Sequence, residues 1–231
     1  KYPADYFDEN ILMNTNIVKV CKEFGVRRFI GVLSTCIYPD KVSLYPMKEE
    51  DMFLGPPTPT NFSYGYAKRC LAVQIDAYNK QYGTKYNYLI PCNLYSEFDE
   101  FYEESRMHFV AALLKKIKNS DTKLNLLGTG KPLRQFMYAG DLSRIIKYFI
   151  ENDITCSVNV APKYNYSINE MAEIAISICG KKLDIVYSNP ELDGQFRKDV
   201  CSEKLINLIP EFEFTSFSEG LAKTYKLINK C

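Results

Sequence analysis

Ser34 and Cys36 stand two residues apart in the stretch LSTCIYPD, directly after the apolar segment RFIGVL. Two interpretations of the cysteine compete. It can be a small buried hydrophobic residue, or a nucleophile or base at the carboxyl end of a strand, where open parallel sheets hold their chemistry. Taken alone, these residues favour the buried cysteine, because thiols are among the most frequently buried side chains.

A second pair with possible chemistry is Tyr64 and Lys68, four residues apart at the start of a predicted helix. This spacing places both side chains on one face, about one turn apart. A lysine there can lower the proton affinity of the tyrosine and hold a ribose. Such pairs also arise by chance in a chain with 18 tyrosines, so the context matters. The pair follows the strand that ends at Ser34, and the next predicted strand ends in polar groups that include Asn93.

Composition narrows the class of protein. The 231 residues, 46% hydrophobic and 25% charged, can bury a full core. Lys and Arg number 29 against 28 Asp and Glu, so the chain carries no large net charge that would attract nucleic acid. An anionic ligand would have to bind to a local cluster of cationic side chains. The eight cysteines form no C-x-x-C pair, and there is one histidine, so we expect thiols in a reducing compartment and no metal. With no long apolar run and no signal peptide, we expect a cytoplasmic protein that does not bind membranes.

Helical and strand patterns alternate along the chain, which is typical of a parallel sheet wrapped by helices. Gly25 and Gly83 are placed to end the first two helices, Asp141 to cap the fourth, and Ser167 with Glu170 to form a capping box on the fifth. The predicted helices span 8–25, 64–83, 107–117, 140–152, 167–180 and about 216–229, and the predicted strands 27–34, 85–95, 123–128, 156–162 and 184–189.

Ser34, Tyr64 and Lys68, in this strand, loop and helix arrangement, resemble the catalytic triad of the extended short-chain dehydrogenase/reductase family. The segments LSTCIYPD, EEDMFLGPPTPTNFSYGYAKR, PCNLY, GTGKPLRQFMYAGDLS and DGQFRK resemble the members that convert GDP-4-keto-6-deoxymannose into GDP-L-fucose. The resemblance covers nearly the whole chain. It implies an α/β fold with a partial, doubly wound Rossmann-type sheet. Residues 1–95 would be the C-terminal part of the NADP-binding domain, and 96–231 a smaller, largely GDP-sugar-binding lobe with segments returning to the first domain.

The resemblance also implies two chemical steps and a role for each residue. In the reduction at C4, Tyr64 donates a proton to the developing alkoxide, Lys68 binds the nicotinamide ribose of NADPH, and Ser34 hydrogen-bonds the carbonyl oxygen. In the epimerisation, Cys36 removes the protons at C3 and C5 and His108 returns them from the other face. The serine then polarises the carbonyl whose acidity the cysteine exploits.

Cofactor and substrate contacts are implied in the same way. Without the resemblance, His108 is an ordinary residue at a helix start, and Lys116 and Arg134 are solvated cations, although two cations suit a diphosphate. The helices that begin near Asp8 and Tyr64 resemble the pair through which the family forms homodimers. The implied NADP(H) contacts are Leu33, Ser34, Lys68, Pro91, Asn93, Leu94 and His108, and the implied GDP-sugar contacts are Lys116, Arg134, Asp193 and Lys198.

Three departures from the family pattern keep other functions open. The glycine-rich phosphate loop is not among these 231 residues, and we expect it to lie upstream of Lys1, to be supplied by a separate chain, or to be lost. Residues 96–101 replace a Gly-Pro turn, and Leu127 replaces a tryptophan. The alternatives are another nucleotide-sugar epimerase or dehydratase of the same family, which Cys36 paired with His108 disfavours, and a catalytically incomplete binding or assembly module. An inert module has no reason to retain all the predicted catalytic residues together.

Overall fold

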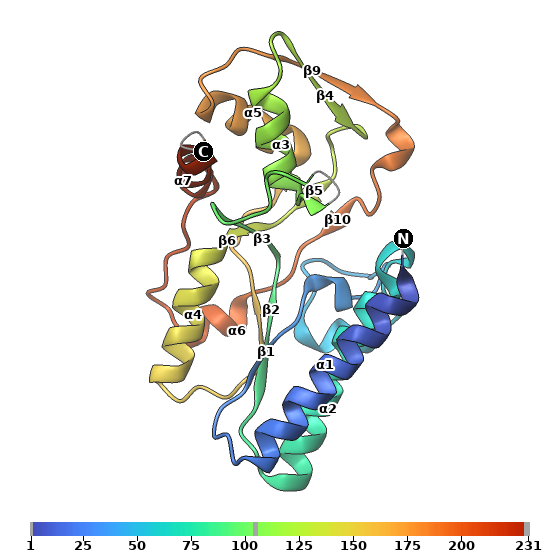
Figure 1. Cartoon of the computed structure of the whole chain (residues 1–231), viewed down its shortest axis with the longest axis vertical. Helices are drawn as coiled ribbons and strands as arrows, with labels where there is room; N and C mark the ends of the chain where they lie inside the picture. The colour runs from blue at the N-terminus through green and yellow to red at the C-terminus, as the bar shows by residue number, and fades with distance from the viewer. Residues whose placement is uncertain (1, 104–105, 229–231) are drawn as a thin grey trace. The chain divides into compact units, whose positions relative to one another are not determined.

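The computed structural model describes residues 2–103 and 106–228, and it divides into two compact units. The first unit comprises residues up to Cys92, Ser143–Ala161 and Val200–Phe212, and the second comprises Asn93–Leu142, Pro162–Asp199 and the segment from Glu213 onward. Helices and mostly parallel strands alternate along the chain (Figure 1), so the predicted α/β class is confirmed.

The first unit is built on a parallel sheet of β1 (Ile30–Val32), β2 (Asn87–Pro91) and β7 (Val158–Val160), with β2 in the centre. The register pairs Val32 with Leu89, and Leu89 with Val158. Because all three strands run in the same direction, their carboxyl ends lie at one edge of the sheet, which is where α/β proteins place their ligands.

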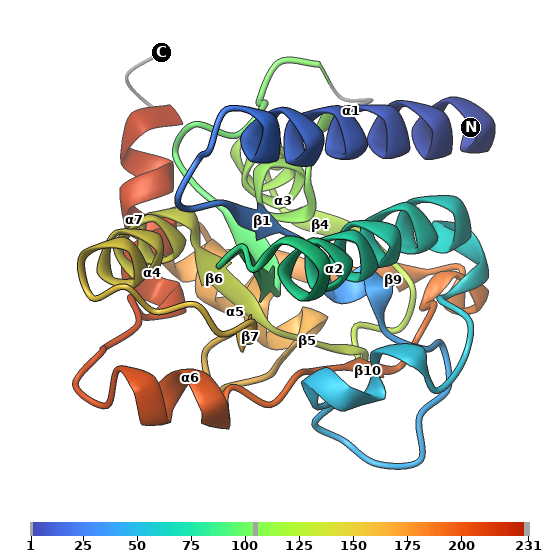
Figure 2. The ribbon, with the colours of Figure 1, turned by 90° about the horizontal axis from the view of Figure 1, so that it is seen from below.

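Two long helices cover one face of this sheet. α1 (Pro3–Glu23) packs along α2 (Phe62–Tyr82), and α2 contacts β2 (Figures 1 and 2). α2 ends at Gly83 in a left-handed conformation with φ of 65°, as predicted. α1 begins several residues before the predicted start near Asp8, because Pro3 initiates the helix.

The remaining elements of the first unit are shorter. The 3-10 helices η1 (Thr35–Ile37), η2 (Glu49–Phe53) and η3 (Pro59–Asn61) connect β1 to α2. α6 (Glu203–Leu208) and the Ser143–Glu151 part of α4 (Ala139–Glu151) lie on the side of the sheet opposite α1 and α2 (Figure 1).

The second unit combines short sheets with helices α3 (Phe109–Lys118), α5 (Ile168–Ile178) and α7 (Phe217–Ile228). Its apolar core joins Leu113 and Leu114 of α3, Met171 of α5 and Leu221 of α7, all nearly inaccessible. The strand pairs are β3 (Asn93–Tyr95) with β6 (Phe136–Tyr138), β4 (Lys123–Leu127) with β9 (Asp184–Ser188), and β5 (Leu133–Arg134) with both β8 (Tyr166–Ser167) and β10 (Arg197–Lys198).

Some local predictions differ from the structure. The single strand expected over residues 85–95 is interrupted at Cys92, and β2 and β3 pair in different sheets. Asp141 does not cap α4, which begins earlier at Ala139. The buried Asp141 carboxylate instead accepts hydrogen bonds from the backbone N–H and hydroxyl of Thr215 at 2.7 and 2.8 Å. The predicted end of the last helix at residue 229 lies outside the described residues.

Across the two described ranges, the structure contains no helix with both the length and the apolar character needed to cross a membrane.

Candidate active site

The turn after β1 presents Ser34 and Cys36 at the carboxyl end of the strand. Leu33 still belongs to the sheet, since its N–H donates to the carbonyl of Leu89 at 2.8 Å. Ser34 then caps η1 in an extended conformation, and its Oγ accepts the Cys36 N–H at 3.3 Å. Both side chains are half-buried. The local sequence therefore ends the strand and places the hydroxyl and the thiol at the same edge of the sheet.

Tyr64 and Lys68 reach the same edge from the first turns of α2. The Lys68 ammonium donates to the carbonyl oxygen of Val32 in β1 at 3.1 Å. It also lies 5.7 Å from the centre of the Tyr64 ring, so the two side chains share one helix face as their spacing predicts. Burial lowers the pKa of Lys68 from its ordinary value.

Tyr64 interacts with both residues of the turn. Burial raises the pKa of Tyr64, and the nearby Cys36 raises it further, whereas a hydrogen bond from Ser34 lowers it. These interactions bring Ser34, Cys36 and Tyr64 into one cluster. Because the phenol keeps its proton at neutral pH, Tyr64 can act as a proton donor beside a hydroxyl donor and a potential thiolate base.

Leu33 and Pro91 frame this cluster within the first unit. Both are buried, and they lie at the carboxyl ends of the neighbouring strands β1 and β2. Such an edge can receive the apolar face of a ring, as expected of residues beside a nicotinamide.

The other predicted site residues belong to the second unit, so their placement relative to the Cys36 cluster stays a prediction. His108 is exposed at the N-cap position of α3. Burial raises the pKa of the nearby Asp99 carboxyl, and the electrostatic interaction with His108 partly offsets this rise. The Asn93 amide donates to the carbonyl of Gln135 at 2.9 Å, and Leu94 is half-buried in β3.

The predicted GDP-sugar contacts are partly grouped. Arg134 and Lys198 face each other in register across β5 and β10. The Asp193 carboxylate accepts both the backbone N–H and the hydroxyl of Thr129 at 2.6 Å, and these bonds lower its pKa. Asp193 therefore holds the turn before β5. Lys116 is exposed on α3.

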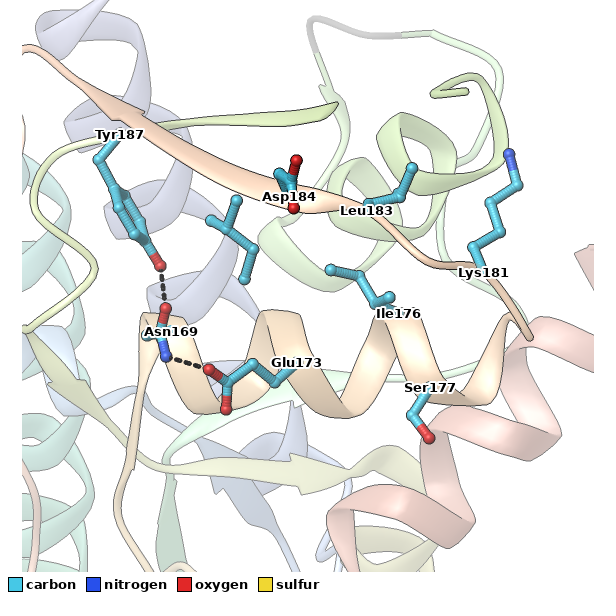
Figure 3. Close-up of a pocket in the computed structure, with 9 residues that line it drawn as sticks. Asn169, Glu173, Ile176, Ser177, Lys181, Leu183, Asp184 and Tyr187 are labelled. Atoms are coloured by element: carbon cyan, nitrogen blue, oxygen red, sulfur yellow. Dashed lines mark hydrogen bonds between the residues drawn. The ribbon is translucent and has the colours of Figure 1, made fainter. Parts of the chain in front are cut away.

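The second unit also has a surface pocket. It is lined by α5 and β9 (Figure 3), and Tyr187 donates to Asn169, which donates to Glu173, both at 2.6 Å. The described residues that line it include no predicted site residue.

Two buried polar residues near the Cys36 turn were not predicted. Arg69 donates to the carbonyl of Ile37, and Asn159 accepts the Tyr38 hydroxyl. The sequence held no clear signal for either, since a polar side chain carries no mark of its burial before the fold is known.

Comparisons with known proteins identify the family of the chain. Residues 1–161 match the NAD dependent epimerase/dehydratase family. The chain belongs to this family.

Particular relatives share one activity. A GDP-L-fucose synthase from Dictyostelium discoideum is 36% identical over 231 residues, covering 97% of this chain and 71% of that protein. One from Sinorhizobium fredii is 34% identical, covering 97% of this chain and 72% of that protein. The crystal structure of a GDP-L-fucose synthetase from Naegleria fowleri bound to NADP superposes with a TM-score of 0.91 at 29% identity, covering 99% of this chain and 74% of that one.

Proposed function

We propose that this protein converts GDP-4-keto-6-deoxymannose into GDP-L-fucose by epimerisation at C3 and C5 and NADPH-dependent reduction at C4. The observation that carries the proposal is the cluster of Ser34, Cys36 and Tyr64 with Lys68 beside them. Reduction alone needs the hydroxyl, the phenol and the ammonium. The Cys36 thiol adds the base that epimerisation requires. The similarity to GDP-L-fucose synthases supports this substrate.

The reduction uses the raised pKa of Tyr64. NADPH, when bound, supplies a hydride to C4. The phenol donates its proton to the C4 oxygen, so the ketone becomes an alcohol, while Ser34 hydrogen-bonds that oxygen. Lys68, whose ammonium donates to the Val32 carbonyl, is proposed to bind the nicotinamide ribose. We propose Leu33, Pro91, Asn93, Leu94 and His108 as further NADP(H) contacts.

The epimerisation uses the same carbonyl. The Cys36 thiolate takes a proton from C3 or C5, and the electron pair moves onto the C4 oxygen, where Ser34 and Tyr64 stabilise the negative charge. A proton must then return on the opposite face of the sugar. We propose His108, exposed at the start of α3, as its donor.

The proposed substrate contacts are mostly cationic, which suits the negative charge of a nucleoside diphosphate. Lys116, Arg134 and Lys198 are proposed to bind the GDP part, because cations suit phosphate oxygens. Asp193 is proposed to act on the same ligand through the turn that its carboxylate holds at Thr129.

The protein is further proposed to form a homodimer through α1 and α2. Five exposed apolar residues follow one another at helical spacing along α1 and its C-cap: Tyr6, Met13, Ile17, Val20 and Phe24. They lie away from Asn14 and Val18, the buried positions of the helix. Such an apolar stripe is typical of a helix that packs against a partner.

A reducing compartment such as the cytoplasm is proposed for the protein. The seven cysteines between Cys21 and Cys201 form no disulfide in the part of the chain that the structure describes, which supports this location.

The test is to incubate the full-length protein with GDP-4-keto-6-deoxymannose and NADPH in deuterated water. We expect NADPH oxidation, GDP-L-fucose as product and deuterium at C3 and C5. Oxidation without deuterium would indicate a simple 4-reductase. Deuterium exchange that proceeds without any NADPH oxidation would indicate an epimerase without the reductase step. Either result would contradict the proposal.

A further inference from the structure

The turn that carries Cys36 is anchored by side chains from two other elements of the first unit. At its start, Leu33 is held by the sheet. At its end, the Ile37 carbonyl accepts Arg69 Nε from α2 at 2.5 Å. The Tyr38 hydroxyl donates to Asn159 Oδ1 in β7 at 2.6 Å. Cys36 thus lies between one anchor in the sheet and two polar anchors.

Arg69 occupies an unusual environment for an arginine. The residue is 5% exposed, and its guanidinium lies over the rings of Tyr66 and Phe53 at 5.1 and 5.9 Å. It forms no ion pair among the described residues, and its Nη2 has no hydrogen-bond partner there. Burying a cation without a carboxylate opposes folding, and burial lowers the pKa of Arg69. What the residue provides in return is a rigid donor to the Ile37 carbonyl.

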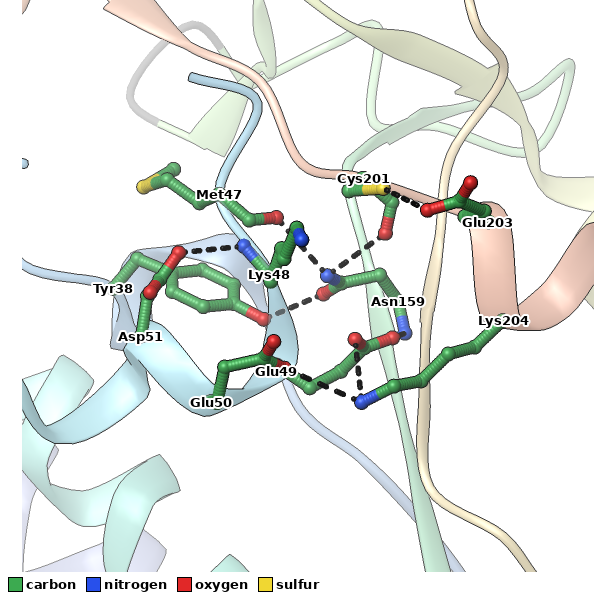
Figure 4. Close-up of polar contacts among 10 residues, drawn as sticks. All are labelled: Tyr38, Met47, Lys48, Glu49, Glu50, Asp51, Asn159, Cys201, Glu203 and Lys204. Carbon is green, nitrogen blue, oxygen red and sulfur yellow. Dashed lines mark hydrogen bonds and ion pairs between the residues drawn. The ribbon is translucent and has the colours of Figure 1, made fainter. Parts of the chain in front are cut away.

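Asn159 is fully buried and uses its whole amide (Figure 4). Its Oδ1 accepts a hydrogen bond from the Tyr38 hydroxyl, and its Nδ2 donates to the carbonyls of Met47 and Cys201 at 3.3 and 3.0 Å. Its backbone N–H donates to Glu49, whose carboxylate pairs with Lys204 at 3.1 Å. The Tyr38 ring is therefore fixed to a network that spans β7, the 47–49 segment and α6.

We propose that Arg69 and Asn159 are positioning residues that hold the end of the 34–38 turn and so aim the Cys36 thiol. The inference rests on the proposed role of Cys36 as the base. Within the turn, the contacts include the Ser34–Cys36 bond at 3.3 Å and backbone bonds from Ile37 to Ser34 and from Tyr38 to Thr35, all of them local to the turn. A displacement of about 1 Å can cost on the order of a hundredfold in rate, so a base on a short turn needs external anchors.

Single substitutions can remove each anchor with little change in volume. Tyr38→Phe removes only the hydroxyl that reaches Asn159, and Arg69→Met removes the donor to Ile37. Matched controls exist in the same unit. Tyr86→Phe removes a hydroxyl that donates to the Val26 carbonyl at 3.1 Å, and Arg28→Met removes an arginine that donates to the Ile154 carbonyl. The controls remove contacts away from the Cys36 turn, and Arg28→Met also removes an ion pair with Asp153 at 3.1 Å.

The first measurement is the rate of Cys36 alkylation by iodoacetamide in the full-length protein, followed by peptide mass spectrometry. The exposed Cys156 is the internal reference. We expect Tyr38→Phe and Arg69→Met to raise the Cys36 rate relative to Cys156 by about threefold or more, because a loosened turn opens a half-buried thiol. The control variants should match the parent. Equal Cys36 rates in all folded variants would overturn the proposal, whatever the activity of the enzyme.

The second measurement separates deuterium exchange at C3 and C5 from NADPH oxidation. Exchange should fall by about tenfold or more in Tyr38→Phe and Arg69→Met, while reduction by Ser34, Tyr64 and Lys68 falls less. Arg69→Lys, which keeps a donor, should recover part of the exchange. Equal losses of both steps would contradict the proposal. If the parent exchanges no deuterium, the proposed function fails, and the alkylation rates still decide the positioning role. If Tyr38→Phe does not fold, the Arg69 variants decide alone.

Discussion

Gly65 lies directly against the backbone carbonyl of Cys36. A Cβ atom at Gly65 would stand 2.6 Å from that oxygen and 2.8 Å from Cβ of Pro57. Neither the backbone nor the proline ring can rotate away as the end of a long side chain would. Only glycine therefore lets the first turn of α2 come this close to the turn after β1. The contact sets the separation between Tyr64, the neighbour of Gly65, and Cys36.

Gly65→Ala is expected to push α2 and the Cys36 turn apart. We expect the free energy of unfolding to fall by about 1–3 kcal/mol, as for other overpacked sites, and both deuterium exchange and reduction to fall by about tenfold or more. Urea unfolding and the two activity assays measure these effects. The control is Gly31→Ala in β1, where the nearest atoms are the flexible ends of Ile75 and Leu71 at 3.0 and 3.3 Å. Gly65→Ala with the stability and rates of the parent would show that the contact is not restrictive.

The sequence predicted those parts of the fold that depend on local patterns. The capping box of Ser167 and Glu170 and the left-handed end of α2 at Gly83 are both confirmed, because neighbouring residues decide them. The break at Cys92 and the role of Asp141 were missed. Residues far away in the chain decide which sheet a strand joins. They also decide which N–H donates a hydrogen bond to a buried carboxylate. Asp141 meets Thr215, for example.

The same division holds for the candidate site. The Tyr64 and Lys68 spacing on a helix, and Ser34 and Cys36 after a strand, placed these residues correctly within the first unit, because each pair is local. The resemblance to a family linked the two pairs. The anchors Arg69 and Asn159 were invisible in the sequence. Asn159 lies on β7 and reaches the Cys36 turn only through the fold.

Thr129→Val tests whether Asp193 acts on the substrate directly or by holding a turn. The substitution removes the hydroxyl that donates to the Asp193 carboxylate but keeps the carboxylate itself. If Asp193 positions the 128–134 segment that leads to Arg134, Thr129→Val and Asp193→Asn should both raise KM for the GDP-sugar by several-fold to about tenfold, with smaller changes in kcat. Steady-state kinetics on both variants measures this. A raised KM in Asp193→Asn alone would indicate direct contact between Asp193 and the substrate.

We expect loss of the Lys68 proton to cause the fall in the reduction rate at high pH. Burial lowers the pKa of Lys68 from 10.5, while burial and Cys36 raise that of Tyr64 from 10.0. Both shifts favour loss of the ammonium proton over loss of the phenol proton, so we predict that the rate falls with the ammonium as pH rises. Lys68→Arg carries a group that stays protonated beyond pH 12. Its pH profile of kcat/KM should decline at a higher pH than that of the parent, even at a lower maximum rate. A decline at the same pH in both proteins would assign the limit to another group.

Ile17→Glu tests the proposed homodimer. Ile17 lies in the middle of the exposed apolar stripe of α1, so a carboxylate there should oppose burial against a partner helix. We expect the parent to sediment as a dimer and Ile17→Glu as a monomer, with the helical content unchanged in circular dichroism. Leu12→Glu is the control, because Leu12 is 62% exposed on α1 but lies outside the stripe. A parent that sediments as a monomer at high concentration would contradict the proposed interface.

Cys36→Ser and Tyr64→Phe should separate the two chemical steps in opposite directions. A serine hydroxyl is a far weaker acid than a thiol, so Cys36→Ser removes the base while leaving Ser34, Tyr64 and Lys68 in place. Deuterium exchange at C3 and C5 should fall by about 10²–10⁴, the usual effect of losing a positioned acid or base. NADPH oxidation should continue, and the product should shift from GDP-L-fucose toward the unepimerised 6-deoxyhexose.

Tyr64→Phe should give the reverse result, because the ring remains and only the proton donor to the C4 oxygen is lost. Ser34 still stabilises negative charge on that oxygen, so the Cys36 thiolate can exchange protons at C3 and C5 while the reduction fails. Deuterium content by mass spectrometry, measured beside NADPH absorbance for both variants, gives the comparison. If Cys36→Ser exchanged deuterium at the parent rate, the half-buried thiol would be a packing residue of the turn, and the base of the epimerisation would have to be another group.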